Sequence, residues 1–234
     1  MNRTTFAKAG CLALTALLLT LLPACSALLP KPAAQPSFFA LDGAPAAALP
    51  ALPVARAATI GATAAPTLVV NPPQASAGFD SQRIIYVRKA HQLEYFAHSE
   101  WVDTPARMLA PLIVAAVDKS GAFRAVVSTP SAAAGDLRLD TEIVRLQHEF
   151  GSTPSRVRLT LRATLTDNAT RQVLARIDFD SVADAASEDA YGGVVAANHA
   201  TRVVLQSLAV FCSDAARQWQ PRDPGVATRA VGRV

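Results

Sequence analysis

Histidines and paired carboxylates are the residues of this chain that could carry acid–base or metal chemistry. None of the histidines has a second histidine four residues away or a cysteine nearby, so the spacing of a metal site is missing. Asp178 and Asp180 alternate with apolar residues and should point to solvent, whereas an acid–base pair needs a desolvated cleft. The four histidines, which we expect at the surface or half-buried, are His91, His98, His148 and His199.

The motifs for nucleotide binding and for nucleophilic catalysis are missing from the sequence as well. No glycine-rich loop ends in Lys-Ser or Lys-Thr, which excludes the ATPase subunit of a transporter. No serine occupies the centre of a Gly-x-Ser-x-Gly turn. We therefore expect a protein without catalytic residues, without a metal site and without a cofactor.

Arginines between residues 156 and 166 offer another kind of chemistry, the binding of anions. In this stretch apolar residues alternate with Arg and Thr, the pattern of a strand that has one face in the core and one in water. Arg156, Arg158 and Arg162 would share the solvent face, where they could contact anionic lipid headgroups or an acidic partner. The alternative is that these arginines only keep an exposed sheet face soluble.

Three aromatic residues form a second candidate surface. Tyr95, Phe96 and Trp101 lie at the end of a predicted hairpin, and Tyr and Trp are enriched at protein interfaces. They could bind a partner protein, with Trp101 as the anchor. They could equally form the lid of the core over the helix that follows.

The first residues have the pattern of an export signal. Arg3 and Lys8 precede an apolar run, residues 11–22, that is short for a bilayer span. The run leads into Leu-Pro-Ala-Cys25, which resembles the lipobox of bacterial lipoproteins, whose cysteine is acylated and becomes the new N-terminus. We interpret residues 1–24 as a lipoprotein signal peptide and Cys25 as the lipidation site. An ordinary secretion signal and a plain membrane anchor are the alternatives.

Removal of this signal changes the charge and the cysteine count of the mature chain. The formal charge falls from +4 to +2, because residues 1–24 hold two cations and no anion. This small excess gives no reason to expect nucleic acid as a partner. With Cys25 acylated, Cys212 is left without a disulfide partner, and we expect it to be a small buried hydrophobe.

Three further stretches have the composition of connecting segments. Residues 25–37 contain prolines without periodicity and predict a tether, and Ser26 favours sorting to the outer membrane by the pattern general to lipoproteins. Residues 43–66 are mostly Ala and Pro and predict a surface loop. The residues from 220 to 234 predict a disordered tail.

The centre of the chain predicts a hairpin, a helix and a strand. Residues 83–96 read as two short strands around a turn at Lys89–His91. Thr104 and Pro105 then begin a helix whose apolar residues recur at helical spacing, and Gly121 is placed to end it in the left-handed conformation. A strand follows at residues 123–127.

The second half predicts an antiparallel meander and a long final helix. Residues 137–150 alternate, but the apolar period slips by one residue near Ile143 and Val144, which indicates a β-bulge. Residues 157–165 and 173–179 form the next strands, and a helix runs from about 188 to 219. The predicted fold is a single α/β domain of the α+β type over residues 38–219. Its mixed or antiparallel sheet has about seven strands, with two helices on one face.

The order and spacing of several motifs resemble one protein family, the ABC-type transport auxiliary lipoproteins, to which the paraquat-inducible lipoprotein belongs. The resemblance covers roughly Phe38 to Trp219 and depends on the whole set of motifs. These are Tyr86, Tyr95-Phe96, Trp101, Asp103-Thr104-Pro105, the G-x-F-x-x-V-V run of residues 121–127, and residues 155–168.

This resemblance implies a function and a set of partners. The chain would be a non-catalytic, lipid-anchored component that faces the periplasm and docks a substrate-binding protein of the mammalian-cell-entry type. Through that protein it would connect to a permease and an ATPase, and it could also form homo-oligomers. A structural or pilot lipoprotein of an outer-membrane assembly machine is the alternative, because such a protein has the same size and class.

Overall fold

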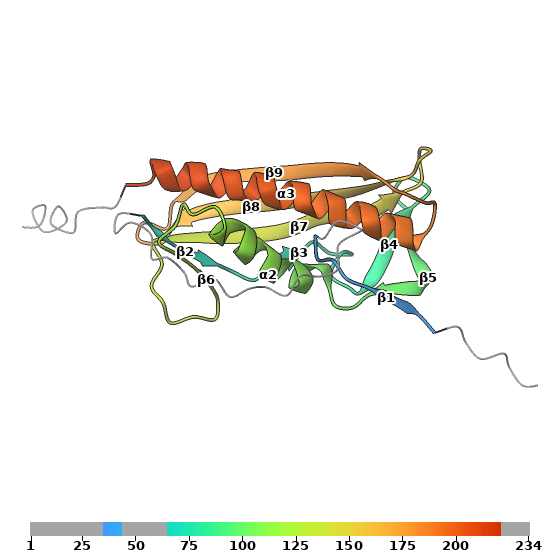
Figure 1. Cartoon of the computed structure of the whole chain (residues 1–234), viewed down its shortest axis with the longest axis horizontal. Helices are drawn as coiled ribbons and strands as arrows, with labels where there is room; N and C mark the ends of the chain where they lie inside the picture. Colours follow the sequence, from blue (N-terminus) through green and yellow to red (C-terminus); the bar gives the residue numbers. More distant parts are fainter. Residues whose placement is uncertain (1–34, 44–64, 221–234) are drawn as a thin grey trace, which may run out of the picture. The chain divides into compact units, whose positions relative to one another are not determined.

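The computed structural model of the chain describes residues 35–43 and 65–220. Most of the predicted signal peptide, tether, Ala/Pro-rich loop and tail lies outside the described residues, and so does Cys25. The described residues from Pro36 onward belong to one compact unit. They form a mixed sheet and two helices, which confirms the predicted fold class (Figure 1).

The strand β7 (Leu137–Glu149) is the centre of the sheet. Along one side it pairs over its whole length with antiparallel β8 (Arg156–Asp167), and β8 pairs in turn with antiparallel β9 (Val173–Asp184). Its other side is shared by three short parallel strands, which are β2 (Thr67–Val70), β3 (Gln74–Ala75) and β4 (Arg83–Val87).

Three more strands extend the sheet beyond these short ones. The strand β5 (Glu94–Trp101) is antiparallel to β4, β1 (Ser37–Phe39) is parallel to β5, and β6 (Ala125–Ser128) is parallel to β2. The described residues therefore hold nine strands, where about seven were predicted. The two-residue β3 is too short to give a periodic signal in the sequence.

The predicted bulge lies within β7. The register between β7 and β8 shifts between Ile143 and Arg145, at the point where the apolar period of the sequence slips. An extra residue in one strand keeps Ile143 and Leu146 both buried in spite of the odd spacing. The prediction of a bulge is confirmed.

The first helix, α2 (Pro105–Asp118), begins where the sequence predicts. Thr104 occupies the N-cap position in an extended conformation, although its side chain makes no capping hydrogen bond. Gly121, just after the C-terminal end of α2, has a φ of 69°, the left-handed conformation expected of it. Leu109, Ile113 and Val117 are buried against the sheet.

The second helix, α3 (Ala190–Gln218), lies along β8 and β9 on the same face as α2 (Figure 1). Its N-cap is Asp189, whose carboxylate accepts a hydrogen bond from Gly192 N at 2.8 Å. By length and composition α3 could cross a membrane, but half of its most apolar part is buried inside the protein. It is the main core helix, and the predicted buried thiol of Cys212 lies in it with no exposed surface.

Candidate functional site

Residue types that can do acid–base chemistry meet at the N-terminal end of α3. His148 Nε2 lies 2.7 Å from Ser155 Oγ, and Ser155 N donates a hydrogen bond to Glu188 Oε1 at 2.8 Å. His148 and Ser155 are 1% and 0% exposed. The prediction of a surface or half-buried histidine is therefore wrong for His148. The other three histidines are exposed, as expected.

The position of His148 follows from strand periodicity and from a glycine. His148 shares the apolar period of Leu146 and Phe150, so the pleat of β7 turns it towards the core. A Cβ atom at Gly193 would lie 2.5 Å from His148 Nδ1, so only glycine allows α3 to pack this closely. Burial lowers the pKa of His148, and the nearby charges of Glu188 and Asp189 oppose this shift only in part.

This cluster is closed to substrates. The cavity beside His148 has a volume of about 10 Å³, enough for about one water molecule. Its walls include Ile84, Trp101 and Val157, which are all buried. Because Ser155 is fully buried as well, the described geometry gives its hydroxyl no access to a substrate. We interpret the cluster as a structural connection between β7, the start of β8 and α3.

The three predicted aromatic surface residues do not form one surface. Trp101 is 3% exposed and belongs to the core, which agrees with the alternative that the sequence left open. Phe96 is half-buried, and its ring centroid lies 4.6 Å from that of Tyr86. Tyr95 is 39% exposed, and the guanidinium of Arg83 lies over its ring. Partner binding stays a prediction for Tyr95 and Phe96, but Trp101 has no exposed ring to offer.

The predicted arginine face lies on the open side of the sheet, where Arg156 is exposed and the other two arginines, Arg158 and Arg162, are partly exposed and form ion pairs. Arg162 Nε lies 2.9 Å from Asp178 Oδ1, and its Nη1 lies 3.2 Å from Glu142 Oε2. Arg158 bridges Asp180 and Glu149 in the same way, at 3.0 and 3.4 Å. The hydrogen bond from Arg162 lowers the pKa of Asp178. Each of these two arginines thus joins β8 to both of its neighbouring strands.

The charges on this face of β7, β8 and β9 cancel. Within the described residues the three strands place equal numbers of basic and acidic side chains on it. The basic ones are Arg138, Arg145, Arg156, Arg158, Arg162 and Arg176, and the acidic ones are Asp140, Glu142, Glu149, Asp178, Asp180 and Asp184. A neutral face exerts little long-range attraction on anionic lipids. This balance favours a stabilising and solubilising role; contact with an anionic surface stays a prediction.

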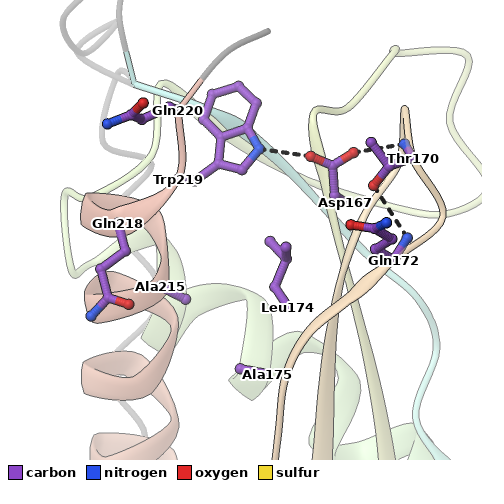
Figure 2. A pocket seen from close by; sticks show the side chains of 9 residues that line it. All are labelled: Asp167, Thr170, Gln172, Leu174, Ala175, Ala215, Gln218, Trp219 and Gln220. Carbon is purple, nitrogen blue, oxygen red and sulfur yellow. Dashed lines mark hydrogen bonds between the residues drawn. The ribbon is translucent and has the colours of Figure 1, made fainter.

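A hollow of about 340 Å³ lies where the C-terminus of α3 meets the turn between β8 and β9 (Figure 2). Trp219 Nε1 donates a hydrogen bond to Asp167 Oδ2 at 3.0 Å, and Thr170 N donates one to Asp167 Oδ1 at 2.8 Å. Burial disfavours the charge on Asp167, but these hydrogen bonds outweigh it and hold the pKa of this carboxyl below its usual value. Leu174 and Ala215 contribute apolar surface to the hollow.

Comparison with known proteins identifies the family. The model of the family described as "ABC-type transport auxiliary lipoprotein component" matches residues 48–209. The chain belongs to this family. Membership in a family of lipoproteins indicates association with the cell envelope. None of the curated proteins matches the sequence.

Solved structures share the fold of this auxiliary lipoprotein. Protein XCC0632 from Xanthomonas campestris is 23% identical, with a TM-score of 0.60 over 65% of this chain and 87% of that one. An uncharacterised protein of known crystal structure is 12% identical, with a TM-score of 0.52 over 79% and 99% of the two chains. At these identities the likeness shows the fold alone.

Residues 40–43, which follow β1, are held on α3 chiefly by one buried side chain. Asn198, on α3, is 7% exposed. Its Oδ1 accepts hydrogen bonds from the backbone N–H groups of Asp42 and Gly43, at 2.8 and 2.7 Å. Its Nδ2 donates to the carbonyl groups of Ala40 and Val194, both at 3.1 Å. The segment that leads from the predicted tether into the domain is thus held on α3.

Proposed function

We propose that this chain is a non-catalytic subunit of an ABC-type transport system of the mammalian-cell-entry kind, anchored by lipid on Cys25. Its domain faces the periplasm and docks the substrate-binding component of that system. The observation that carries the proposal is the match to the family of auxiliary transport lipoproteins over residues 48–209. A cysteine in a lipobox-like sequence, upstream of that match, supports it.

The anchor and the tether set where the domain works. Each buried methylene of an acyl chain contributes about 0.8 kcal/mol, so two or three chains on Cys25 hold the protein firmly on the membrane. Eleven peptide steps separate Cys25 from Pro36, and an extended chain spans about 3.5 Å per residue. The domain therefore begins within about 40 Å of the membrane surface. Ser26 after the cysteine favours the outer membrane in this proposal.

The role of the subunit in this proposal is positional. The sequence has no nucleotide-binding loop, so the energy for transport comes from a separate ATPase. Among the described residues, the cavity beside His148 is too small for a substrate and the charged sheet face is neutral. In this proposal the domain contributes contact surface, and the tether keeps that surface within reach of the membrane.

Affinity purification of the full-length lipoprotein from its own cells tests this function. We expect the mammalian-cell-entry-type protein, the permease and the ATPase to co-purify with it from the membrane fraction. The matched control is Cys25→Ala, which should be missing from that fraction. Co-purification of an outer-membrane assembly protein in place of the transport proteins would contradict the proposal and support a pilot lipoprotein.

A further inference from the structure

Two exposed aromatic side chains lie on one face of the sheet, at the end where the chain enters the domain. Phe38 of β1 is directly opposite Glu100 of β5, and Glu100 is directly opposite Arg83 of β4. Residues directly opposite each other in neighbouring strands project from the same face of a sheet. The guanidinium of Arg83 lies 4.8 Å from the centre of the Tyr95 ring. We call these four residues, Phe38, Arg83, Tyr95 and Glu100, the entry patch.

The core does not bury the two rings of the entry patch. Phe39 points to the opposite face, where its ring centroid lies 6.4 Å from that of Tyr191 on α3. Phe38 therefore points away from the helices, and it is 59% exposed, while Tyr95 is 39% exposed. Val102, whose N–H donates to the carbonyl of Phe39, is 51% exposed and adds apolar surface beside β1. Aromatic and aliphatic groups beside an arginine are typical of surfaces that enter the lipid headgroup region.

The charges around the entry patch are balanced. Residues 80–107 hold four cations, which are Arg83, Arg88, Lys89 and Arg107, and four carboxylates, which are Asp80, Glu94, Glu100 and Asp103. Arg88 binds Glu94, and Arg107 binds Asp103, both at 3.1 Å. A neutral surface is neither attracted nor repelled by headgroups at long range. A membrane contact at this patch therefore depends on its exposed rings and on a device that keeps it close to the lipid.

The course of the chain supplies that device. Eleven peptide steps separate Cys25 from Pro36, directly before β1, and they span at most about 40 Å. Because β1 is parallel to β5, its N-terminal end points in the direction of the turn between β4 and β5, residues 88–93. Figure 1 shows β1, β4 and β5 together at this end of the sheet. A lipid on Cys25 would hold the entry patch at a high local concentration near the membrane, where even a weak contact is populated.

We propose that the entry patch lies in the headgroup region of the membrane that holds the lipid anchor, with the rings of Phe38 and Tyr95 among the headgroups. This inference rests on the lipid anchor of the proposed function. The anchor keeps the domain at the membrane, and the patch fixes the orientation of the domain on it.

This orientation decides which end of the domain is presented to the periplasm. The strand β4 joins β7 at His148 and Glu149, near one end of β7, whereas the turn between β8 and β9 follows Asp167, which pairs with Leu137 at the other end. The 13 residues of β7 span about 40 Å at 3.4 Å per residue. With the entry patch on the membrane, the end that holds the hollow beside Trp219 points away from it.

A fluorophore near the entry patch tests this orientation in the full-length lipidated protein. Cys25 is acylated in that protein, and Cys212 is buried, which raises the pKa of its thiol to about 12, so a maleimide selects an introduced surface cysteine. Ala97→Cys places the label two residues after Tyr95, and Ala169→Cys places it in the β8–β9 turn; both alanines are exposed. In vesicles of phosphatidylethanolamine and phosphatidylglycerol with a nitroxide on the headgroup, the label at 97 should be quenched at least threefold more than the label at 169.

Replacement of the two rings shows whether they make the contact. Phe38→Ser/Tyr95→Ser should lower the quenching at position 97 by at least half. The matched control is Val203→Ser/Val210→Ser, at exposed apolar positions of α3, which should leave the quenching unchanged. Circular dichroism melts show whether these variants are folded. The comparison of positions 97 and 169 needs neither variant.

The outcomes separate this inference from the proposed function. Flotation of the vesicles shows whether the protein is anchored, and a protein that does not float overturns the anchor and this inference together. A floating protein with equal quenching at both positions, or with quenching that the ring variant leaves unchanged, overturns the inference alone. If unlipidated Cys25→Ala protein self-associates and the ring variant makes it monomeric, the entry patch binds a second copy, and the inference is also overturned.

Discussion

The two faces of the sheet use charged and polar residues in opposite ways. On the face covered by α2 and α3, the buried side chains of Asn198 and His148 each bond particular partners. On the open face of β7, β8 and β9, charged residues are dense and cancel one another across the strands. Buried polar groups are costly if unpaired, whereas exposed charges contribute little.

This difference indicates which residues hold the fold and which are free for function. Replacement of a polar residue on the covered face removes partners that water cannot replace. Replacement of an arginine on the open face leaves the other groups of the network hydrated.

The largest expected effect is that of Trp101→Ala. Because Trp101 is buried, the substitution should lower the free energy of unfolding by about 3–5 kcal/mol. The exposed Tyr95 is the matched comparison, and Tyr95→Ala should change stability little. Urea titration of both variants measures the difference. A stable, well-folded Trp101→Ala protein that loses its partner would restore the prediction of an aromatic interface.

The next largest effect concerns residues 40–43, which Asn198 holds on α3. Asn198→Ala leaves the N–H groups of Asp42 and Gly43 without the side-chain acceptor, which should cost about 1–3 kcal/mol. Hydrogen exchange at residues 37–43 should become faster than in the wild type. Ser207→Ala, at an exposed position of the same helix, serves as the control. Unchanged exchange at these residues would mean that Asn198 does not hold the segment.

A smaller effect should appear in the dependence of stability on pH. Burial lowers the pKa of His148, so the unfolded chain binds a proton there that the folded protein does not. Stability should therefore decrease as the pH falls below about 6.5, the ordinary value for histidine. The lowered pKa values of Glu188 and Asp189, the carboxyls beside it, act in a more acidic range.

Thermal melts between pH 7.5 and 5.0 measure this dependence. His148→Gln should flatten the profile, while His91→Gln, which changes an exposed histidine, should leave it as it is. If the two variants have the same profile as the wild type, the titration of His148 does not influence folding.

The smallest effect is expected on the open face. Arg158→Gln/Arg162→Gln should lower stability only slightly, because both arginines are partly exposed and such ion pairs are screened. Binding of the unlipidated Cys25→Ala protein to anionic vesicles should be weak with or without these arginines. A clear loss of vesicle binding in the double variant would instead support the predicted contact with lipid headgroups.

Features that depend on a single strand or helix could be predicted from the sequence. The bulge near Ile143 follows from a slip in periodicity, and the left-handed Gly121 follows from its place after a helix. The burial of His148 could also have been predicted, because His148 occupies an apolar position in the alternating pattern of β7. The contact between His148 and Gly193 could not have been predicted, because these two residues lie 45 positions apart in the chain.

The candidate surfaces were harder to predict because they depend on how distant elements pack. Trp101 lines the same small cavity as Gly193 and Ala197 of α3, and no local pattern around the hairpin indicates this contact. The arginines were placed correctly on the open face. Their neutralisation depends on the register that brings Asp178 and Glu142 beside Arg162, which periodicity alone does not give.

The central claim is that the lipoprotein holds the substrate-binding component at a membrane, and vesicle flotation tests it most directly. Vesicles carrying the full-length lipidated protein are mixed with the purified substrate-binding protein and centrifuged through a density gradient. We predict that this protein floats with the vesicles, and that it stays at the bottom when Cys25→Ala replaces the wild type. If it stays at the bottom with the lipidated wild type as well, the account is contradicted.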